Sequence, residues 1–127
     1  ASDVALIAAN ADTFGVPNVR AVAGRAPEAL ADLPDPDAVF VGGTGRQVSA
    51  VLQASYARLA TRGRMVVNVA TIDGLASAYE TMKSLAGEVH VWNIQIARGI
   101  DQMDRVRFEA INPSFLLSVA KSEESTD

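Results

Sequence analysis

The chain has 127 residues, of which 49% are hydrophobic and 20% charged, a composition typical of a globular protein with one sizeable core. It contains no cysteine and one histidine, which excludes disulfide bonds, thiolate metal sites and sites built from several imidazoles. Three acidic residues of the tail 122–127 account for most of the net charge of −4, so the rest of the chain is nearly neutral and offers no basic stripe for nucleic acid. No apolar run approaches the roughly 20 residues of a membrane span, and no signal peptide is visible. The sequence therefore predicts a cytoplasmic protein without a metal site.

The first third of the chain predicts one helix and one strand. Apolar residues recur at helical spacing over Ser2–Phe14, and Gly15 follows as a stop signal. A short strand is expected at Val19–Ala23. A turn with one helical segment then follows at Gly24–Leu30, where a proline suits the first helical turn.

The middle of the chain alternates between strands and helices. Asp37–Val41 is a continuous apolar run, which is typical of a strand buried on both faces. A helix at Arg46–Ala60, a strand at Arg64–Val69 and a helix from Asp73 to Ala86 follow, and Asp73 is expected to cap the last of these. This alternation predicts a mostly parallel α/β sheet.

The last part of the chain predicts two further strands. Val89–Ala97 alternates with period two, and the apolar face that carries Trp92 suits either a core or an interface between copies of a homo-oligomer. Arg98–Arg107 is polar and is expected to form a loop, and Pro113 is expected to open the final strand at Phe115–Ala120. Because no helical pattern joins the two strands, we predict that they are antiparallel.

Glycines at one strand end indicate a ligand site. Ligands of parallel sheets bind at the carboxyl ends of the strands, and Gly42-Gly43-Thr44-Gly45 follows a predicted strand directly. Three glycines in four residues let a ligand approach the backbone, and the next helix offers free N–H groups to an anion. The segment matches neither G-x-G-x-x-G nor the P-loop. A tight turn without a ligand is the alternative interpretation.

Three other segments are weaker candidates. Asn68 ends an apolar strand, where it either faces the same ligand-binding edge of the sheet as the glycines or caps the next helix. Arg98 follows a long strand, where it suits either a substrate carboxylate or a surface ion pair. Gly24–Pro27 either lines a flat ring or forms a plain turn. No nucleophile or close pair of carboxylates presents itself, so the catalytic residues stay unassigned, and chemistry by positioning and a reactive cofactor is favoured.

Several motifs appear in a characteristic order: residues 8–19, 24–30, 33–34, 36–43, 66–71 and 96–99. In this order the chain resembles, up to Lys121, the precorrin methyltransferases of cobalamin biosynthesis, which include decarboxylating precorrin-6Y C5,15-methyltransferases and separate cobalt-precorrin C15-methyltransferases. The resemblance implies a class I, Rossmann-like methyltransferase fold with S-adenosylmethionine as methyl donor. It also implies a tetrapyrrole substrate, precorrin-6B or its cobalt form, rimmed with acetate and propionate carboxylates, which is methylated at C15 and loses the carboxylate of its C12 acetate.

The resemblance also assigns the candidate residues. It implies cofactor contacts for Gly24, Arg25, Ala26, Pro27 and Gly42, and substrate contacts for Gly43, Thr44, Gly45, Asn68, Thr71 and Arg98.

One departure from the family pattern concerns the first strands. The family's strand order is 3-2-1-4-5-7-6, and its glycine-rich cofactor loop and ribose-binding acid lie upstream of the first helix found here. Strands 1 and 2 are thus expected to be absent. We therefore interpret residues 1–121 as a partial methyltransferase domain, inactive by itself, followed by a disordered acidic tail at 122–127. The alternatives are another small-molecule S-adenosylmethionine methyltransferase, or a non-catalytic α/β interaction module.

Overall fold

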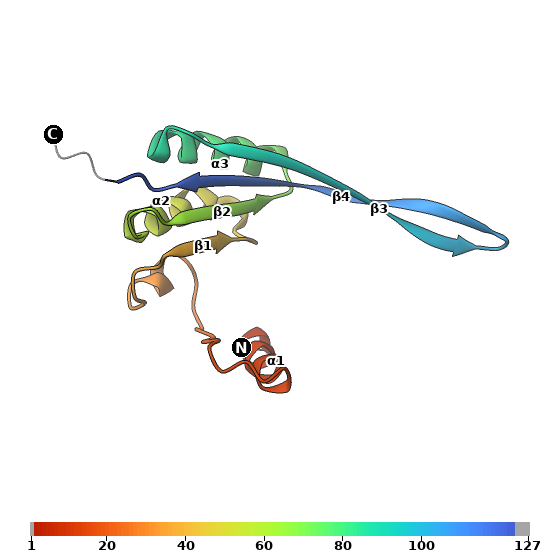
Figure 1. Ribbon diagram of the computed structural model, residues 1–127, viewed down its shortest axis with the longest axis horizontal. Helices are drawn as coiled ribbons and strands as arrows, with labels where there is room; N and C mark the ends of the chain where they lie inside the picture. The colour runs from red at the N-terminus through yellow and green to blue at the C-terminus, as the bar shows by residue number, and fades with distance from the viewer. Residues whose placement is uncertain (1, 124–127) are drawn as a thin grey trace. The chain divides into compact units, whose positions relative to one another are not determined.

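The computed structural model describes residues 2–123, which form two units that divide after Pro34 (Figure 1). The predicted acidic tail begins within the described residues, since Glu123 forms an ion pair with Arg62, while residues 124–127 lie outside them. Within residues 2–123, no helix is long and apolar enough to cross a membrane, and no group of three acidic or histidine side chains is arranged to hold a metal ion.

The first unit contains a helix and one helical turn. Helix α1 (Ser2–Thr13) ends one residue before the predicted end, and the N–H of Val16 donates to the carbonyl of Ala11 at 2.9 Å. The short helix η1 (Glu28–Leu30) confirms the predicted helical segment, with Pro27 at its N-cap and not in its first turn.

The prediction of a strand at residues 19–23 is wrong. This segment forms no ladder with any part of residues 2–123. An extended segment becomes a strand only through hydrogen bonds to a neighbour, and the apolar side chains of Val19 and Val22 are 51% and 41% exposed. A β-prone sequence alone is therefore not enough to form a strand here.

The second unit is a mixed four-stranded sheet with two helices. Its strands are β1 (Ala38–Val41), β2 (Arg64–Val69), β3 (His90–Gln102) and β4 (Arg105–Ala120), in the order β1-β2-β4-β3. β1 and β2 are parallel, whereas β4 is antiparallel to both β2 and β3. The predicted antiparallel closing pair is confirmed. The sheet is mixed: β1, β2 and β3 run in one direction, with α2 and α3 as the connecting helices, and only β4 runs in the opposite direction, so the strand directions are mostly parallel as predicted.

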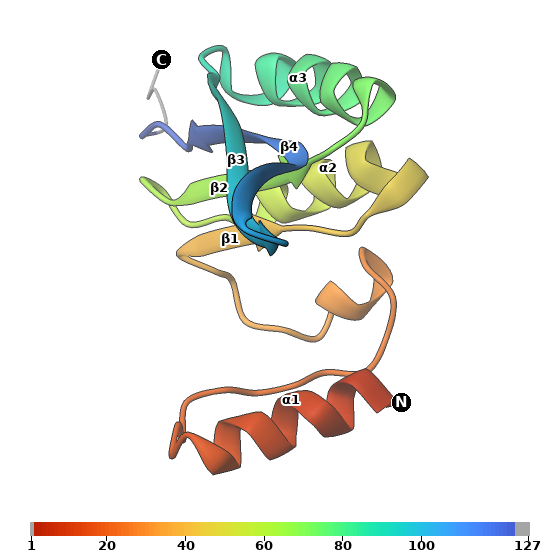
Figure 2. The same ribbon diagram turned by 90° about the vertical axis from the view of Figure 1, so that its right-hand side faces the viewer.

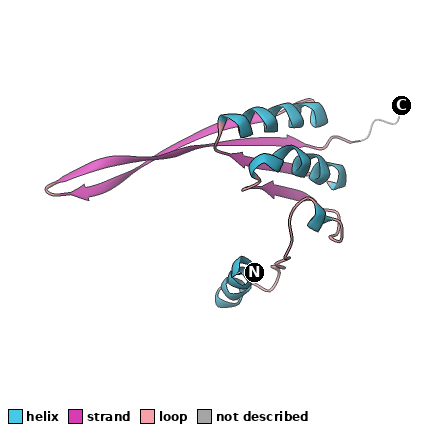
Figure 3. Ribbon diagram, turned by 180° about the vertical axis from the view of Figure 1, so that it is seen from behind, coloured by secondary structure: helices cyan, strands magenta, loops and turns pink. Residues whose placement is uncertain are grey.

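Helices α2 (Val48–Arg58) and α3 (Ile72–Ala86) pack on one face of this sheet (Figures 2 and 3). The core lies between them and the strands, where five large side chains are fully buried: Leu52, Met65, Val67, Met82 and Leu117. On the other face, Phe40 and Trp92 are 69% and 65% exposed. The position of Trp92 thus excludes a core role within this unit.

The hairpin of β3 and β4 extends far beyond the other strands (Figure 1). Residues 96–102 pair with residues 105–111, and we call this two-stranded ribbon (96–111) the arm. The prediction of a loop at residues 98–107 is therefore wrong, because only Met103 and Asp104 form the turn between β3 and β4. The arm is exposed to solvent on both faces, so its sequence need not alternate between apolar and polar residues.

Pro113 lies inside β4 and does not open it. Ile94 is opposite Ser114, but Ile96 is opposite Ile111, so two residues of β4 face one residue of β3. This irregularity is a β-bulge, and it accommodates a proline because the bulged position needs no N–H donor.

Candidate functional site

The glycine turn follows β1 directly and leads into the short helix η2 (Gly45–Gln47) and then α2. The φ angles of Gly43 and Gly45 are +66° and +57°, a region that other residues rarely adopt. A Cβ atom added at either glycine would meet no atom within 4 Å. These glycines are thus required by the backbone, and the space beside them is open to a ligand.

The start of α3 is built on Thr71. The N–H of Gly74 donates to Thr71 Oγ1 at 2.9 Å, so Thr71 and not Asp73 is the N-cap residue. A Cβ at Gly74 would lie 2.8 Å from Thr71 Oγ1, so this close approach requires a glycine. Asp73 lies in the first turn, where its charge is favourable near the positive end of the helix dipole.

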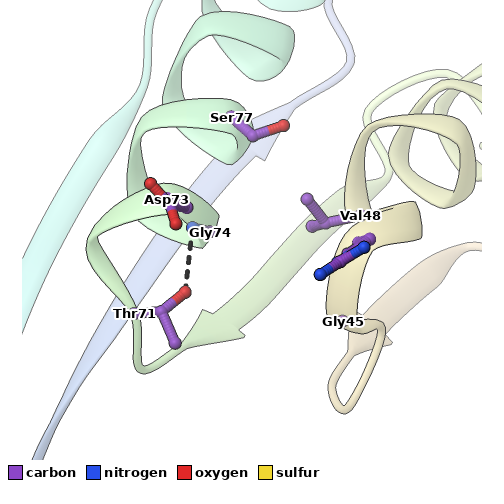
Figure 4. A pocket seen from close by; sticks show the side chains of 7 residues that line it. Gly45, Val48, Thr71, Asp73, Gly74 and Ser77 are labelled. Carbon is purple, nitrogen blue, oxygen red and sulfur yellow. Dashed lines mark hydrogen bonds between the residues drawn. The ribbon is translucent and has the colours of Figure 1, made fainter.

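A pocket of about 410 Å³ lies between the starts of α2 and α3. Figure 4 shows Gly45 and Val48 on the side of α2, across from Thr71, Asp73 and Ser77 on the side of α3. The volume lies within the usual range of small-molecule sites. Its position, after the carboxyl ends of the parallel strands β1 and β2, is where an α/β sheet binds its ligands. The lining residues are Gly45, Arg46, Val48, Thr71, Asp73, Gly74 and Ser77.

The pocket contains one cation, one carboxylate and two hydroxyl groups. Arg46 and Asp73 are exposed, and none of the ion pairs found in residues 2–123 includes either of them. The hydroxyls belong to Thr71 and Ser77. This arrangement can bind and orient a ligand that presents both a carboxylate and hydrogen-bonding groups.

Two of the predicted site residues, Gly45 and Thr71, line this pocket, and Gly42–Thr44 precede it in the glycine turn. Asn68 does not line it, because it alternates with the buried residues of β2 and so lies on the sheet face away from the helices. Asn68 is not the cap of α3 either, since Thr71 has that role.

The position of Arg98 differs from its sequence prediction. It lies within β3, in the arm, opposite Glu109 and 4.0 Å from its carboxylate. The side chain is 68% exposed and does not line the pocket. The surface ion pair that was the alternative interpretation is what the structure contains.

The predicted cofactor segment Gly24–Pro27 lies in the first unit. It forms a turn before η1, in which Gly24 and Arg25 are exposed and the N–H of Ala29 donates to the carbonyl of Arg25 at 2.9 Å. Its contact with a cofactor stays a prediction.

Sequence reasoning missed Arg46, Asp73 and Ser77 as pocket residues. Asp73 and Ser77 are four residues apart on one helix and therefore share a face. Arg46 directly follows the glycine turn. The helical spacing of Asp73 and Ser77 and the position of Arg46 after the glycine turn can both be read from the sequence. That these residues meet across one pocket depends on the parallel pairing of β1 with β2, which the sequence does not show directly.

The strand order defines the class of protein. β1-β2-β4-β3, with β4 inserted antiparallel between β2 and β3, corresponds to strands 4-5-7-6 of the class I methyltransferase order. An S-adenosylmethionine-dependent O-methyltransferase from Thermotoga maritima has a TM-score of 0.74 over 98% of this chain and 48% of its own; at 16% identity, this likeness shows the fold alone. The second unit thus has the fold of a class I, Rossmann-like methyltransferase.

The family model of the precorrin methyltransferase domain matches residues 1–120, and the chain belongs to this family. A probable cobalt-precorrin-6B C(15)-methyltransferase (decarboxylating) from Pyrobaculum calidifontis is 36% identical over 110 residues, which are 86% of this chain and 56% of that protein. The structure of precorrin-6Y C5,15-methyltransferase from Geobacter metallireducens GS-15 is 35% identical, with a TM-score of 0.83 over 91% of this chain and 61% of its own. The chain therefore spans less than two thirds of the length of these relatives. Fold and family together imply the use of S-adenosylmethionine.

Proposed function

We propose that the protein is a decarboxylating C-methyltransferase of cobalamin biosynthesis. It transfers a methyl group from S-adenosylmethionine to C15 of precorrin-6B, or of its cobalt form, and the C12 acetate loses its carboxylate as carbon dioxide. The observation that carries this proposal is the match of the family model along residues 1–120. The pocket at the carboxyl edge of a class I sheet supports it. A cytoplasmic location is part of the same proposal.

The residues at this edge fit a donor and an acceptor bound side by side. S-adenosylmethionine supplies an electrophilic methyl group on a sulfonium. Gly42 contacts the donor in this proposal, while Gly43–Gly45 and Thr71 face the tetrapyrrole. The family resemblance alone proposes a donor contact for Gly24–Pro27, which belongs to the first unit. The open space beside Gly43 and Gly45 leaves room for a flat ring close to the backbone. The contribution of these residues is to position the two reactants.

The proposal is tested with the complete gene product, precorrin-6B and S-adenosylmethionine labelled in its methyl group. We expect the label to enter the tetrapyrrole and one carbon dioxide to be released for each methyl transferred. Methyl transfer without carbon dioxide release would indicate a different methyltransferase. If neither labelled tetrapyrrole nor carbon dioxide forms, the protein has the family fold but does not catalyse this reaction.

We also propose that the protein is a homo-oligomer assembled through the arm. An isolated two-stranded hairpin is at best marginally stable in water, so a ribbon of this length needs a partner surface. Large apolar side chains of the arm are exposed, among them Met103 (99%), Phe108 (78%) and Val106 (64%).

The charges of the arm favour a second copy of this chain as the partner. Three arginines and three acidic residues share the ribbon, so its net charge is zero: Arg98, Arg105, Arg107, Asp101, Asp104 and Glu109. A neutral ribbon has no net attraction for nucleic acid or an anionic membrane. Two copies of it can meet without repulsion, and their apolar side chains leave water together.

A further inference from the structure

Arg46 is the only cationic side chain among the residues that line the pocket. Its backbone is held on both sides, because the N–H of Gln47 donates to the carbonyl of Thr44 at 3.2 Å and Val48 is only 2% exposed. The side chain is exposed, and no ion pair or side-chain hydrogen bond found in the described part of the chain includes it. A guanidinium on a held backbone position beside the pocket is thus left available to a ligand.

Within residues 2–123, most other arginines of the second unit form an ion pair, whereas Arg46 does not. Four others form ion pairs with carboxylates: Arg58 with Asp35, Arg62 with Glu123, and both Arg98 and Arg107 with Glu109. Arg46 also has an acid in its own pocket, Asp73, yet no ion pair joins the two. Both charged side chains therefore line the pocket without forming an ion pair with each other.

The groups beside Arg46 define the chemistry that the pocket accepts. One arginine and one aspartate give the lining a net charge of zero, which disfavours a di- or triphosphate but tolerates a single carboxylate. The planar guanidinium binds a carboxylate through two parallel hydrogen bonds. Thr71 Oγ1 already accepts a hydrogen bond from Gly74, so its O–H remains free to donate. Arg46 and Thr71 together thus supply donors to a carboxylate.

We propose that Arg46 binds a carboxylate of a reactant held in this pocket and thereby sets the affinity of the enzyme for that reactant. The inference rests on the proposed function, in which two bound molecules carry such a group. One source is a peripheral acetate or propionate of the tetrapyrrole, and the other is the amino-acid end of S-adenosylmethionine. Kinetics in which each reactant is varied separately distinguish the two sources.

The test compares Arg46→Ala with Arg46→Lys and with the matched control Arg64→Ala in the complete gene product. Arg64 is also an exposed arginine without an ion pair in residues 2–123, and it lines a different pocket at the opposite end of β2. We expect Arg46→Ala to raise KM for one reactant about tenfold, as loss of a hydrogen bond to a charged group does, and to change kcat by less than twofold. Arg46→Lys should recover part of this loss, because lysine keeps the charge without the planar fork. Arg64→Ala should match the wild type.

The affected reactant identifies the carboxylate. A raised KM for precorrin-6B with an unchanged KM for S-adenosylmethionine assigns it to the substrate, and the reverse assigns it to the donor. Both KM values within twofold of the wild type, in a variant with an unchanged Tm, would overturn the role of Arg46. A wild-type enzyme that does not methylate precorrin-6B contradicts the proposed function instead. In that case, equilibrium binding of each reactant to wild type and Arg46→Ala tests the carboxylate site by itself.

Discussion

Thr71 Oγ1 accepts a hydrogen bond from the N–H of Gly74 at 2.9 Å, which fixes the start of α3 and one wall of the pocket. Replacing Thr71 with alanine leaves this N–H without its cap, and the free energy of unfolding should fall by about 1 kcal/mol. Thr71→Ser keeps the hydroxyl and should stay within about 0.5 kcal/mol of the wild type. Urea denaturation of the three proteins measures the difference. Equal stability of the alanine and serine variants would contradict the capping role.

Gly43 has a φ of +66° in a turn with free space around it. Gly43→Ala should therefore lower the free energy of unfolding by about 1 kcal/mol through backbone strain and not through a clash. Asparagine tolerates this conformation better than alanine, so Gly43→Asn should be the more stable of the two variants. Thermal unfolding followed by circular dichroism gives the order. An asparagine variant that is no more stable than the alanine variant would contradict backbone conformation as the cause.

Features that depend on short-range sequence were predicted well. The strand at Arg64–Val69 has the predicted bounds, and α1 and α3 differ from theirs by one residue at one end. Apolar spacing, cap residues and glycine stops are encoded within a few positions, so they can be read locally. The glycine turn after β1 belongs to the same group, because a buried strand and three glycines are adjacent in the chain.

Apart from the antiparallel closing pair, features that depend on long-range pairing could not be predicted. Residues 19–23 look like a strand but have no pairing partner among the described residues. The polar residues 98–102 and 105–107 belong to β3 and β4 because each strand of the arm supplies the other's hydrogen bonds. Arg46 and Asp73 share a pocket although 27 positions separate them, as a result of the parallel pairing of β1 and β2. Neither local composition nor periodicity contains this information.

The arm provides a test of assembly. Phe108 is 78% exposed in the ribbon, and Phe108→Asp places a charge where the second copy is expected to pack. We predict a shift to a smaller species in size-exclusion chromatography with light scattering, because burying an unpaired charge is strongly unfavourable. Ile72→Asp is the matched control, since Ile72 is 86% exposed at the start of α3 and is not part of the arm. A wild-type protein that is monomeric at micromolar concentration would contradict the assembly.

Residues 1–127 by themselves should bind S-adenosylmethionine weakly. The sheet of the second unit corresponds to strands 4-5-7-6 of the class I order, so the described strands supply one side of the crevice at the switch point of the fold, where dinucleotide-type ligands bind. The relatives that share the fold are longer, since the chain spans 56% of one and 61% of another. Isothermal titration calorimetry of the 127-residue segment should show a Kd above about 1 mM, which corresponds to less than about 4 kcal/mol of binding free energy. Micromolar binding by this segment would show that the glycine turn and the loop Gly24–Pro27 are sufficient to hold the donor.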